Sequence, residues 1–245
     1  MFRRVNNTNV NPDSLPTGAG YINENLGELI IPLNYLVTGQ GTAIGPYSDG
    51  TNTDADSFVY HATNPFDIPA QIANLVCTVT YMWFVPAFER KGSNLKRVAI
   101  QKVTNGNWNA KGGLYADNGS NKHLPLTLLS DFGTLALTIN HGGGEEWNVD
   151  YTFPDDGLYW YGMKFDVANQ LAAWSSAHPS PWGYIYPLGN GQNIQSLVGV
   201  RLQDVTYADA IPSDLTGRTF YACVGGGQFA PKVYRGYAAF SEPVV

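Results

Sequence analysis

The sequence predicts an all-β protein, with a jelly-roll-like β-sandwich at residues 28–245 and an extended N-terminal arm at residues 1–27. Charged residues make up only 14% of the chain, whereas roughly 25% is usual in globular proteins. The polar positions are filled mainly by Asn, Gly, Thr and Ser, which favour turns and are poor helix formers. Short runs of β-branched and aromatic residues recur between these turn clusters, a pattern typical of a sandwich with many strands.

The predicted strands are separated by clusters of Gly, Pro, Asn and Asp. Ile72–Phe84 is the longest run, and it has too few helix formers to be helical. Leu95–Val103 alternates apolar and polar residues, as a half-buried strand does. The other predicted strands are Leu29–Val37, Ser57–His61, Gly113–Tyr115, Thr134–Ile139, Glu146–Phe153, Gly157–Val167, Leu197–Val205, Thr219–Val224 and Lys232–Phe240. Val167–Ser176 alone predicts a helical turn, and the sequence has neither a fixed-period repeat nor heptads.

Residues 1–27 are polar and rich in Asn, Pro and Gly, without apolar periodicity. We interpret them as an extended arm that a partner orders, with a disordered terminus as the alternative. Phe2, Arg3 and Arg4 are followed by polar residues, so no signal peptide is predicted. No apolar run reaches the ~18 residues of a transmembrane helix, so we expect synthesis in a cytoplasm and no membrane insertion.

The balance of charge bears on the partners of the protein. The net charge of -6 argues against binding nucleic acid or an anionic membrane through bulk electrostatics. The local basic run at residues 90–97 is interpreted as a solvated loop and strand edge.

Cys77 and Cys223 lie in apolar runs, where a thiol behaves as a small hydrophobic group. A disulfide between them is geometrically allowed, but spacing alone does not support it.

Sequence motifs give little sign of catalysis. The chain has no Walker A loop, no G-x-S-x-G elbow and no H-E-x-x-H or C-x-x-C pattern. The four histidines, at positions 61, 123, 141 and 178, have no second ligand type at metal spacing. The pairs Glu145–Glu146 and Asp155–Asp156 are adjacent in sequence, and neighbours on a strand point to opposite faces. We therefore expect a protein that is not an enzyme and has no cofactor.

One loop carries several oxygen ligands in a short stretch, at Asp49, Asn52, Asp54 and Asp56. Calcium favours such donors, so a bound calcium ion is one hypothesis for this loop. The loop lacks the fixed Gly and the distant bidentate Glu of an EF-hand. A solvated loop of Asx turns is the favoured interpretation.

An aromatic segment at residues 174–191 (WSSAHPSPWGYIYPLGNG) is the strongest candidate for ligand binding. Aromatic rings on proline-stiffened loops offer flat faces at low entropic cost, which suits a host-surface glycan or a protein partner. The alternative is that the rings cap the sandwich core or lie in a subunit interface. The candidate residues are Trp174, His178, Trp182, Tyr184 and Tyr186.

Several stretches, taken in order, resemble a β-sandwich module of bacteriophage tail fibres and other phage virion proteins. The resemblance spans residues 57–167, with a weaker echo toward the C-terminus. It is carried by Trp83–Pro86 (WFVP, a strand end), Leu95–Ile100 (LKRVAI), Gly113–Gly119 (GLYADNG), Asp131, Gly133 and Leu158–Tyr161 (LYWY). It implies a jelly-roll-like module at a virion surface, often trimeric, that serves attachment or capsid decoration.

The function expected from this resemblance is that of a structural virion protein assembled in the host cytoplasm. The expected role is a tail-fibre or surface-fibre subunit, a homotrimer that docks onto other virion proteins through residues 1–27 and presents the sandwich for host attachment. The chain has no long shaft before the module, so a capsid or neck decoration (cement) protein is the first alternative. A carbohydrate-binding or depolymerising module is the second.

Overall fold

The computed structural model describes residues 58–63, 73–120, 123–138, 144–175, 199–223 and 229–238. These residues form thirteen strands and no helix. The strands are β1 (Phe58–Ala62), β2 (Ala73–Val76), β3 (Met82–Glu89), β4 (Asn94–Gln101), β5 (Trp108–Asp117), β6 (Pro125–Leu137), β7 (Gly144–Thr152), β8 (Gly157–Phe165), β9 (Gln170–Ser175), β10 (Val200–Leu202), β11 (Phe220–Ala222), β12 (Phe229–Pro231) and β13 (Val233–Ala238). The predicted all-β class is therefore confirmed. Among these residues no helix has the length and apolarity needed to span a bilayer.

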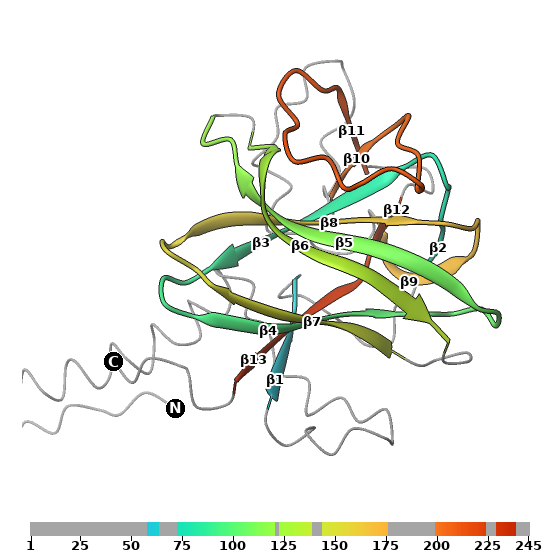
Figure 1. Cartoon of the computed structure of the whole chain (residues 1–245), viewed down its shortest axis with the longest axis horizontal. Helices are drawn as coiled ribbons and strands as arrows, with labels where there is room; N and C mark the ends of the chain where they lie inside the picture. Colours follow the sequence, from blue (N-terminus) through green and yellow to red (C-terminus); the bar gives the residue numbers. More distant parts are fainter. Residues whose placement is uncertain are drawn as a thin grey trace, which may run out of the picture.

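The strands form three antiparallel sheets. A six-stranded sheet has the order β11-β10-β3-β8-β5-β6, and a four-stranded sheet has the order β1-β13-β4-β7. Figure 1 shows the strands β3, β8, β5 and β6 as one layer above β4, β7 and β13, the arrangement of a β-sandwich. A third, three-stranded sheet has the order β12-β9-β2.

The main core fills the space between the two large sheets. It includes Trp83 and Val85 from β3, Val98 and Ile100 from β4, and Trp147 from β7, all buried. On β3 these residues alternate with Met82 and Phe84, which belong to a second apolar cluster. Alternate residues of a strand point to opposite faces. The six-stranded sheet is therefore buried on both sides, and this explains why β8 reads as one apolar run (LYWYGMKF).

The second cluster is covered by the segment that joins β10 to β11. Val205, Ile211 and Leu215 of this segment pack with Met82, Phe84, Tyr115 and Trp160 from the sheet. Two lysines fasten the segment by donating hydrogen bonds to its backbone carbonyls. Lys164 Nζ donates to the oxygens of Thr206, Asp209 and Ala210 at 2.8–3.1 Å, and Lys111 Nζ donates to those of Tyr207, Ala208 and Asp209 at 3.0–3.4 Å.

Close packing of this face requires a glycine at position 162. A Cβ atom there would lie 2.8 Å from both Met82 Cε and Phe84 Cε1, and 2.9 Å from Tyr115 Cε2. Real Cβ atoms essentially never approach other atoms this closely. Gly162 thus allows three large side chains of neighbouring strands to meet over β8.

A buried polar cluster connects the two sheets of the sandwich. Glu89 of β3 accepts hydrogen bonds from Tyr161 Oη of β8 (2.6 Å), from Arg235 Nη1 of β13 (2.7 Å) and from Tyr237 Oη of β13 (2.5 Å). The side chains of Glu89 and Arg235 have no solvent exposure. Burial by itself lowers the pKa of Arg235, but the adjacent carboxylate of Glu89 reverses this effect and raises the pKa.

Three predictions about individual strands are corrected by the structure. Ile72–Phe84 was predicted as one strand, but it forms β2 and β3 around a turn that the Tyr81 N–H to Thr78 carbonyl bond closes. Val167–Ser176 is not helical: residues 170–175 form β9, which pairs with β2 and β12. Tertiary pairing therefore overrides the helix propensity of its Ala and Leu residues.

Pro86 does not end its strand, because β10 covers β3 only from Met82 to Phe84. A proline is tolerated where a strand has no neighbour on one side.

Both cysteines are buried and free. Burial raises the pKa of the Cys77 thiol well above its ordinary value and raises that of Cys223 to about 12. The two thiols thus act as small apolar side chains of the core.

The first prediction concerns the buried ion pair. Glu89→Gln leaves the Arg235 charge without its carboxylate in the core, so we expect a loss of roughly 3–5 kcal/mol of unfolding free energy in urea titrations. The double variant Glu89→Leu/Arg235→Met should recover much of this loss, because no charge remains buried. The matched control is Asp150→Asn, which breaks the exposed Lys96–Asp150 pair and should change stability little. A loss no larger than that of the control would contradict the buried-pair argument.

The second prediction concerns alkaline pH. Burial first, and then Glu89, raise the pKa of Tyr161 well above the ordinary value of 10.0, and burial likewise raises the pKa of Tyr237 and of Tyr115. The folded state therefore holds protons that the unfolded chain releases near pH 10, and unfolding free energy should fall as pH rises above about 10. Lys102 and Lys164, whose pKa values burial lowers, act in the opposite sense, but the tyrosines with a raised pKa outnumber them. Urea midpoints and tyrosinate absorbance measured together test this, and tyrosines that all ionise while the protein is folded would contradict it.

Candidate functional site

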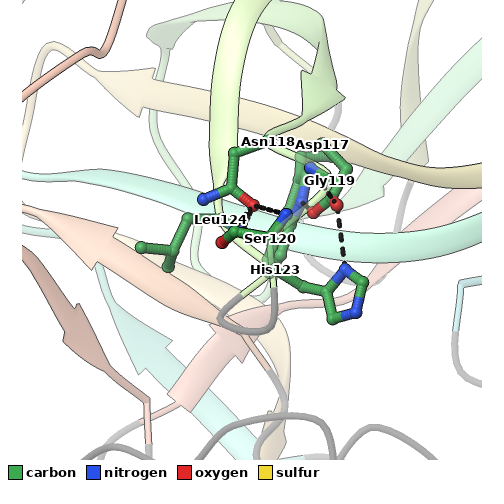
Figure 2. Close-up of polar contacts among 7 residues, drawn as sticks. Asp117, Asn118, Gly119, Ser120, His123 and Leu124 are labelled. Atoms are coloured by element: carbon green, nitrogen blue, oxygen red, sulfur yellow. Dashed lines mark hydrogen bonds and ion pairs between the residues drawn. The ribbon is translucent and has the colours of Figure 1, made fainter.

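The loop between β5 and β6 holds a group of polar contacts that centres on Asp117 and Asn118 (Figure 2). Asn118 Oδ1 accepts hydrogen bonds from the Ser120 N–H (3.1 Å), the Ser120 hydroxyl (3.0 Å) and the Leu124 N–H (3.2 Å). Gly119 has a φ of 63°, a left-handed conformation that glycine adopts at no steric cost. The Asp-Asn-Gly-Ser sequence thus builds this turn from its own side chains.

Asp117 joins this loop to the core and to a histidine. Its Oδ1 accepts a hydrogen bond from the indole Nε1 of the buried Trp160 (3.0 Å). Its Oδ2 accepts one from the Gly119 N–H (2.9 Å) and lies 2.9 Å from Nδ1 of His123. The Asp117 side chain is 10% exposed and that of His123 is 37% exposed. The carboxylate is therefore the inner member of the pair, and the imidazole is the outer member.

This geometry fixes the orientation of the imidazole. With the Asp117 carboxylate ionised, His123 Nδ1 is the donor, so Nε2 is the nitrogen left for another partner. Figure 2 shows the Nδ1 edge of the ring toward Asp117 and the other edge directed away. Carboxylate-oriented histidines serve as general bases and as metal ligands when a nucleophile or further ligands are nearby. Within the described part of the chain, no group of three or more His, Cys, Asp and Glu side chains is arranged so that it could hold a metal ion.

The two carboxylate pairs considered for catalysis each have other partners. Glu146 Oε1 lies 3.1 Å from Nε of Arg97, and Glu145 Oε1 accepts a hydrogen bond from the Thr138 N–H (2.5 Å). Lys91 contacts both members of the second pair: its Nζ lies 3.6 Å from Asp155 Oδ1, and its N–H donates to Asp156 Oδ1 (2.7 Å). These contacts fit a role for the four carboxylates in holding strand ends and turns.

Most of the predicted site residues lie outside the described ranges. This holds for the calcium hypothesis at Asp49, Asn52, Asp54 and Asp56, for His178, Trp182, Tyr184 and Tyr186 of the aromatic segment, and for the arm at residues 1–27. Trp174 belongs to β9, where its Cα lies opposite that of Ala230. The glycan, partner and calcium assignments therefore stay predictions.

The Asp117–His123 pair was missed by the sequence reasoning. His123 was regarded as isolated because no second ligand type stands at metal spacing from it. The available signal was the Asp-Asn-Gly-Ser turn that follows a predicted strand. This turn brings Asp117 within contact of His123, which comes six residues later in the sequence. The contact between Asp117 and Trp160 spans 43 residues of sequence and has no local signal.

Comparisons with known proteins give no further guide to the role of these residues. No protein-family model matches the chain, and no curated protein matches it.

The third prediction separates the two members of the pair. Asp117→Ala leaves the buried indole N–H of Trp160 and the Gly119 N–H without their acceptor, so we expect a loss of about 1–3 kcal/mol of unfolding free energy. His123→Ala removes only the partly exposed ring and should cost less. Urea unfolding followed by tryptophan fluorescence measures both, and an equal loss in the two variants would contradict the assignment of Asp117 as the inner anchor.

Proposed function

We propose that this chain is a structural, non-enzymatic protein of a bacteriophage virion: a tail-fibre or surface-fibre subunit that docks through residues 1–27. The β-sandwich presents its loops for host attachment, and the jelly-roll-like topology belongs to this proposal. A homotrimer suits the role, because symmetry multiplies weak host contacts into avidity.

The observation that carries the proposal is the position of the residues that resemble phage modules. The WFVP motif lies in β3, the GLYADNG motif begins in β5, and the LYWY motif lies in β8. β8 pairs with both other strands, so that Pro86 and Tyr115 lie on either side of Trp160. Three motifs scattered over the sequence therefore meet in one row at the centre of the six-stranded sheet. This supports a resemblance of folded modules and not of isolated peptides.

The fourth motif, LKRVAI, supports the same interpretation. It forms most of β4, the strand between β13 and β7 in the opposite sheet. Leu95, Val98 and Ile100 from this motif are fully buried in the core between the sheets. The quoted motifs thus define both layers of one sandwich.

A capsid or neck decoration protein is the alternative with the same fold. It would be present in many copies on the shell, and the purified protein would have no effect on host adsorption. A depolymerising module would release reducing ends from host polysaccharide, which the proposed function excludes.

The fourth prediction tests the proposed location and the arm. Immunogold labelling or cryo-electron microscopy of intact particles should place the full chain on a fibre, and native mass spectrometry should give a trimer. Deletion of residues 1–27 should abolish incorporation into particles while the isolated domain retains a β-rich circular dichroism spectrum. Absence of the protein from particles would refute the proposed function, and normal incorporation of the truncated protein would refute the role of the arm.

A further inference from the structure

The dipeptide Asn118–Gly119 lies in the loop between β5 and β6, where the chain can react with itself. In such a reaction the backbone nitrogen of the second residue attacks the side-chain carboxamide of the asparagine. A glycine in second place hinders this attack least, because it has no side chain. Gly119 is exposed, and a Cβ atom built on it would meet no atom within 4 Å. Solvent and space are therefore both available at the nitrogen.

The carboxamide of Asn118 is polarised by three donors (Figure 2). Its Oδ1 accepts hydrogen bonds from the N–H and the hydroxyl of Ser120 and from the N–H of Leu124, at 3.0–3.2 Å. When a nucleophile attacks Cγ, negative charge develops on this oxygen. Donors that already point at the oxygen stabilise the charge, as an oxyanion hole does. The loop therefore makes Cγ of Asn118 a better electrophile.

The attacking nitrogen has a base beside it. The Gly119 N–H donates a hydrogen bond to Asp117 Oδ2 at 2.9 Å, which is within the reach of a general base for the proton that it removes. The carboxylate is held by two further groups, the indole Nε1 of Trp160 on Oδ1 (3.0 Å) and Nδ1 of His123 on Oδ2 (2.9 Å). Asp117 is thus fixed in contact with the proton that must leave.

Main-chain hydrogen bonds keep these groups together. The Asn118 N–H donates to the Leu124 carbonyl (2.9 Å), and the His123 N–H donates to the Ser120 carbonyl (3.1 Å). The base, the nucleophile and the oxyanion donors therefore belong to one loop of fixed shape. Holding reacting groups in place lowers the entropy that the reaction must lose. The same residues in an unfolded chain lack this advantage.

We propose that Asn118 is a self-modification site, at which the folded loop accelerates its own deamidation. Asp117 takes the proton of the Gly119 nitrogen, and this nitrogen forms a bond to Cγ of Asn118. The bond from Cγ to Nδ2 breaks, and the amide nitrogen leaves as ammonia with the transferred proton. Water then opens the resulting succinimide ring at either of its two carbonyl carbons. The products are aspartate and isoaspartate at position 118.

The modification changes the charge and the shape of the loop. The new carboxylate stands next to that of Asp117, and like charges at short range repel. Isoaspartate in addition lengthens the backbone of the turn by one atom. Deamidation is irreversible in water, so each copy of the protein would keep a record of its age. This inference is independent of the proposed virion function.

The fifth prediction compares the folded full chain with the same chain unfolded in guanidinium chloride, both at neutral pH. Peptide mapping by mass spectrometry follows aspartate and isoaspartate at each Asn-Gly pair, and the sequence has three: Asn105–Gly106, Asn118–Gly119 and Asn190–Gly191. In the unfolded chain the three pairs should react at similar rates. Folding should accelerate the reaction at Asn118 by roughly tenfold or more, because the base and the oxyanion donors are then in place.

Variants assign the groups. Asp117→Asn removes the base and should slow the reaction at Asn118 in the folded protein by roughly tenfold or more. Ser120→Ala removes one of three donors and should slow it by a smaller factor. The matched control is Asp214→Asn, which changes an aspartate that accepts the Thr216 N–H in another turn and should leave the rate at Asn118 unchanged.

Circular dichroism establishes that each variant is folded, and the comparison of the folded with the unfolded parent needs no variant. A reaction at Asn118 that is slower in the folded parent than in the unfolded chain would overturn the proposal, because the loop would then protect the carboxamide. Equal rates in the folded parent and in folded Asp117→Asn would also overturn it. Particle labelling is unaffected by either result, so the self-modification can fail while the virion assignment stands.

Discussion

The sandwich depends on one charged contact between its two sheets, the buried pair of Glu89 and Arg235. An ion pair without solvent exposure is costly to form, and here three donors share the two oxygens of the carboxylate. Because β3 and β13 belong to different sheets, the contact is satisfied only when the sheets face each other in one register. The surrounding apolar core supplies most of the driving force for folding, whereas this cluster constrains how the layers are stacked.

Most strands could be predicted from composition and local pattern, because β-branched and aromatic runs between turn residues have few other solutions. Leu95–Val103 and Glu146–Phe153, for example, closely match β4 and β7. Local patterns failed where long-range pairing decides the outcome. Residues 170–175 form a strand because β2 and β12 flank them, and the turn at residues 77–81 interrupts an apolar run that shows no break in the sequence.

The polar contacts were the least predictable part of the molecule. Glu89 and Arg235 are 146 residues apart, and neither has a neighbour in sequence that indicates a partner. The same limit applies to Asp117 and Trp160, which meet only after β5 and β8 have paired. Turns such as those at Asp117–Ser120 and at Asp214–Thr216, by contrast, follow from residues within a few positions of one another. From one sequence, the side-chain contacts within a turn can therefore be predicted. Contacts between strands can be predicted only when the pairing register of the strands is known.

The fastening of residues 206–210 has a consequence for how this surface can change. Lys111 and Lys164 hold main-chain oxygens there, and every amino acid supplies the same oxygen. Thr206, Ala208 and Ala210 are exposed, so new residues can be placed at these positions without loosening the attachment. The attachment of residues 206–210 therefore does not depend on which side chains they carry. Evolution would be able to change the surface of this segment while the sheet beneath it stays the same.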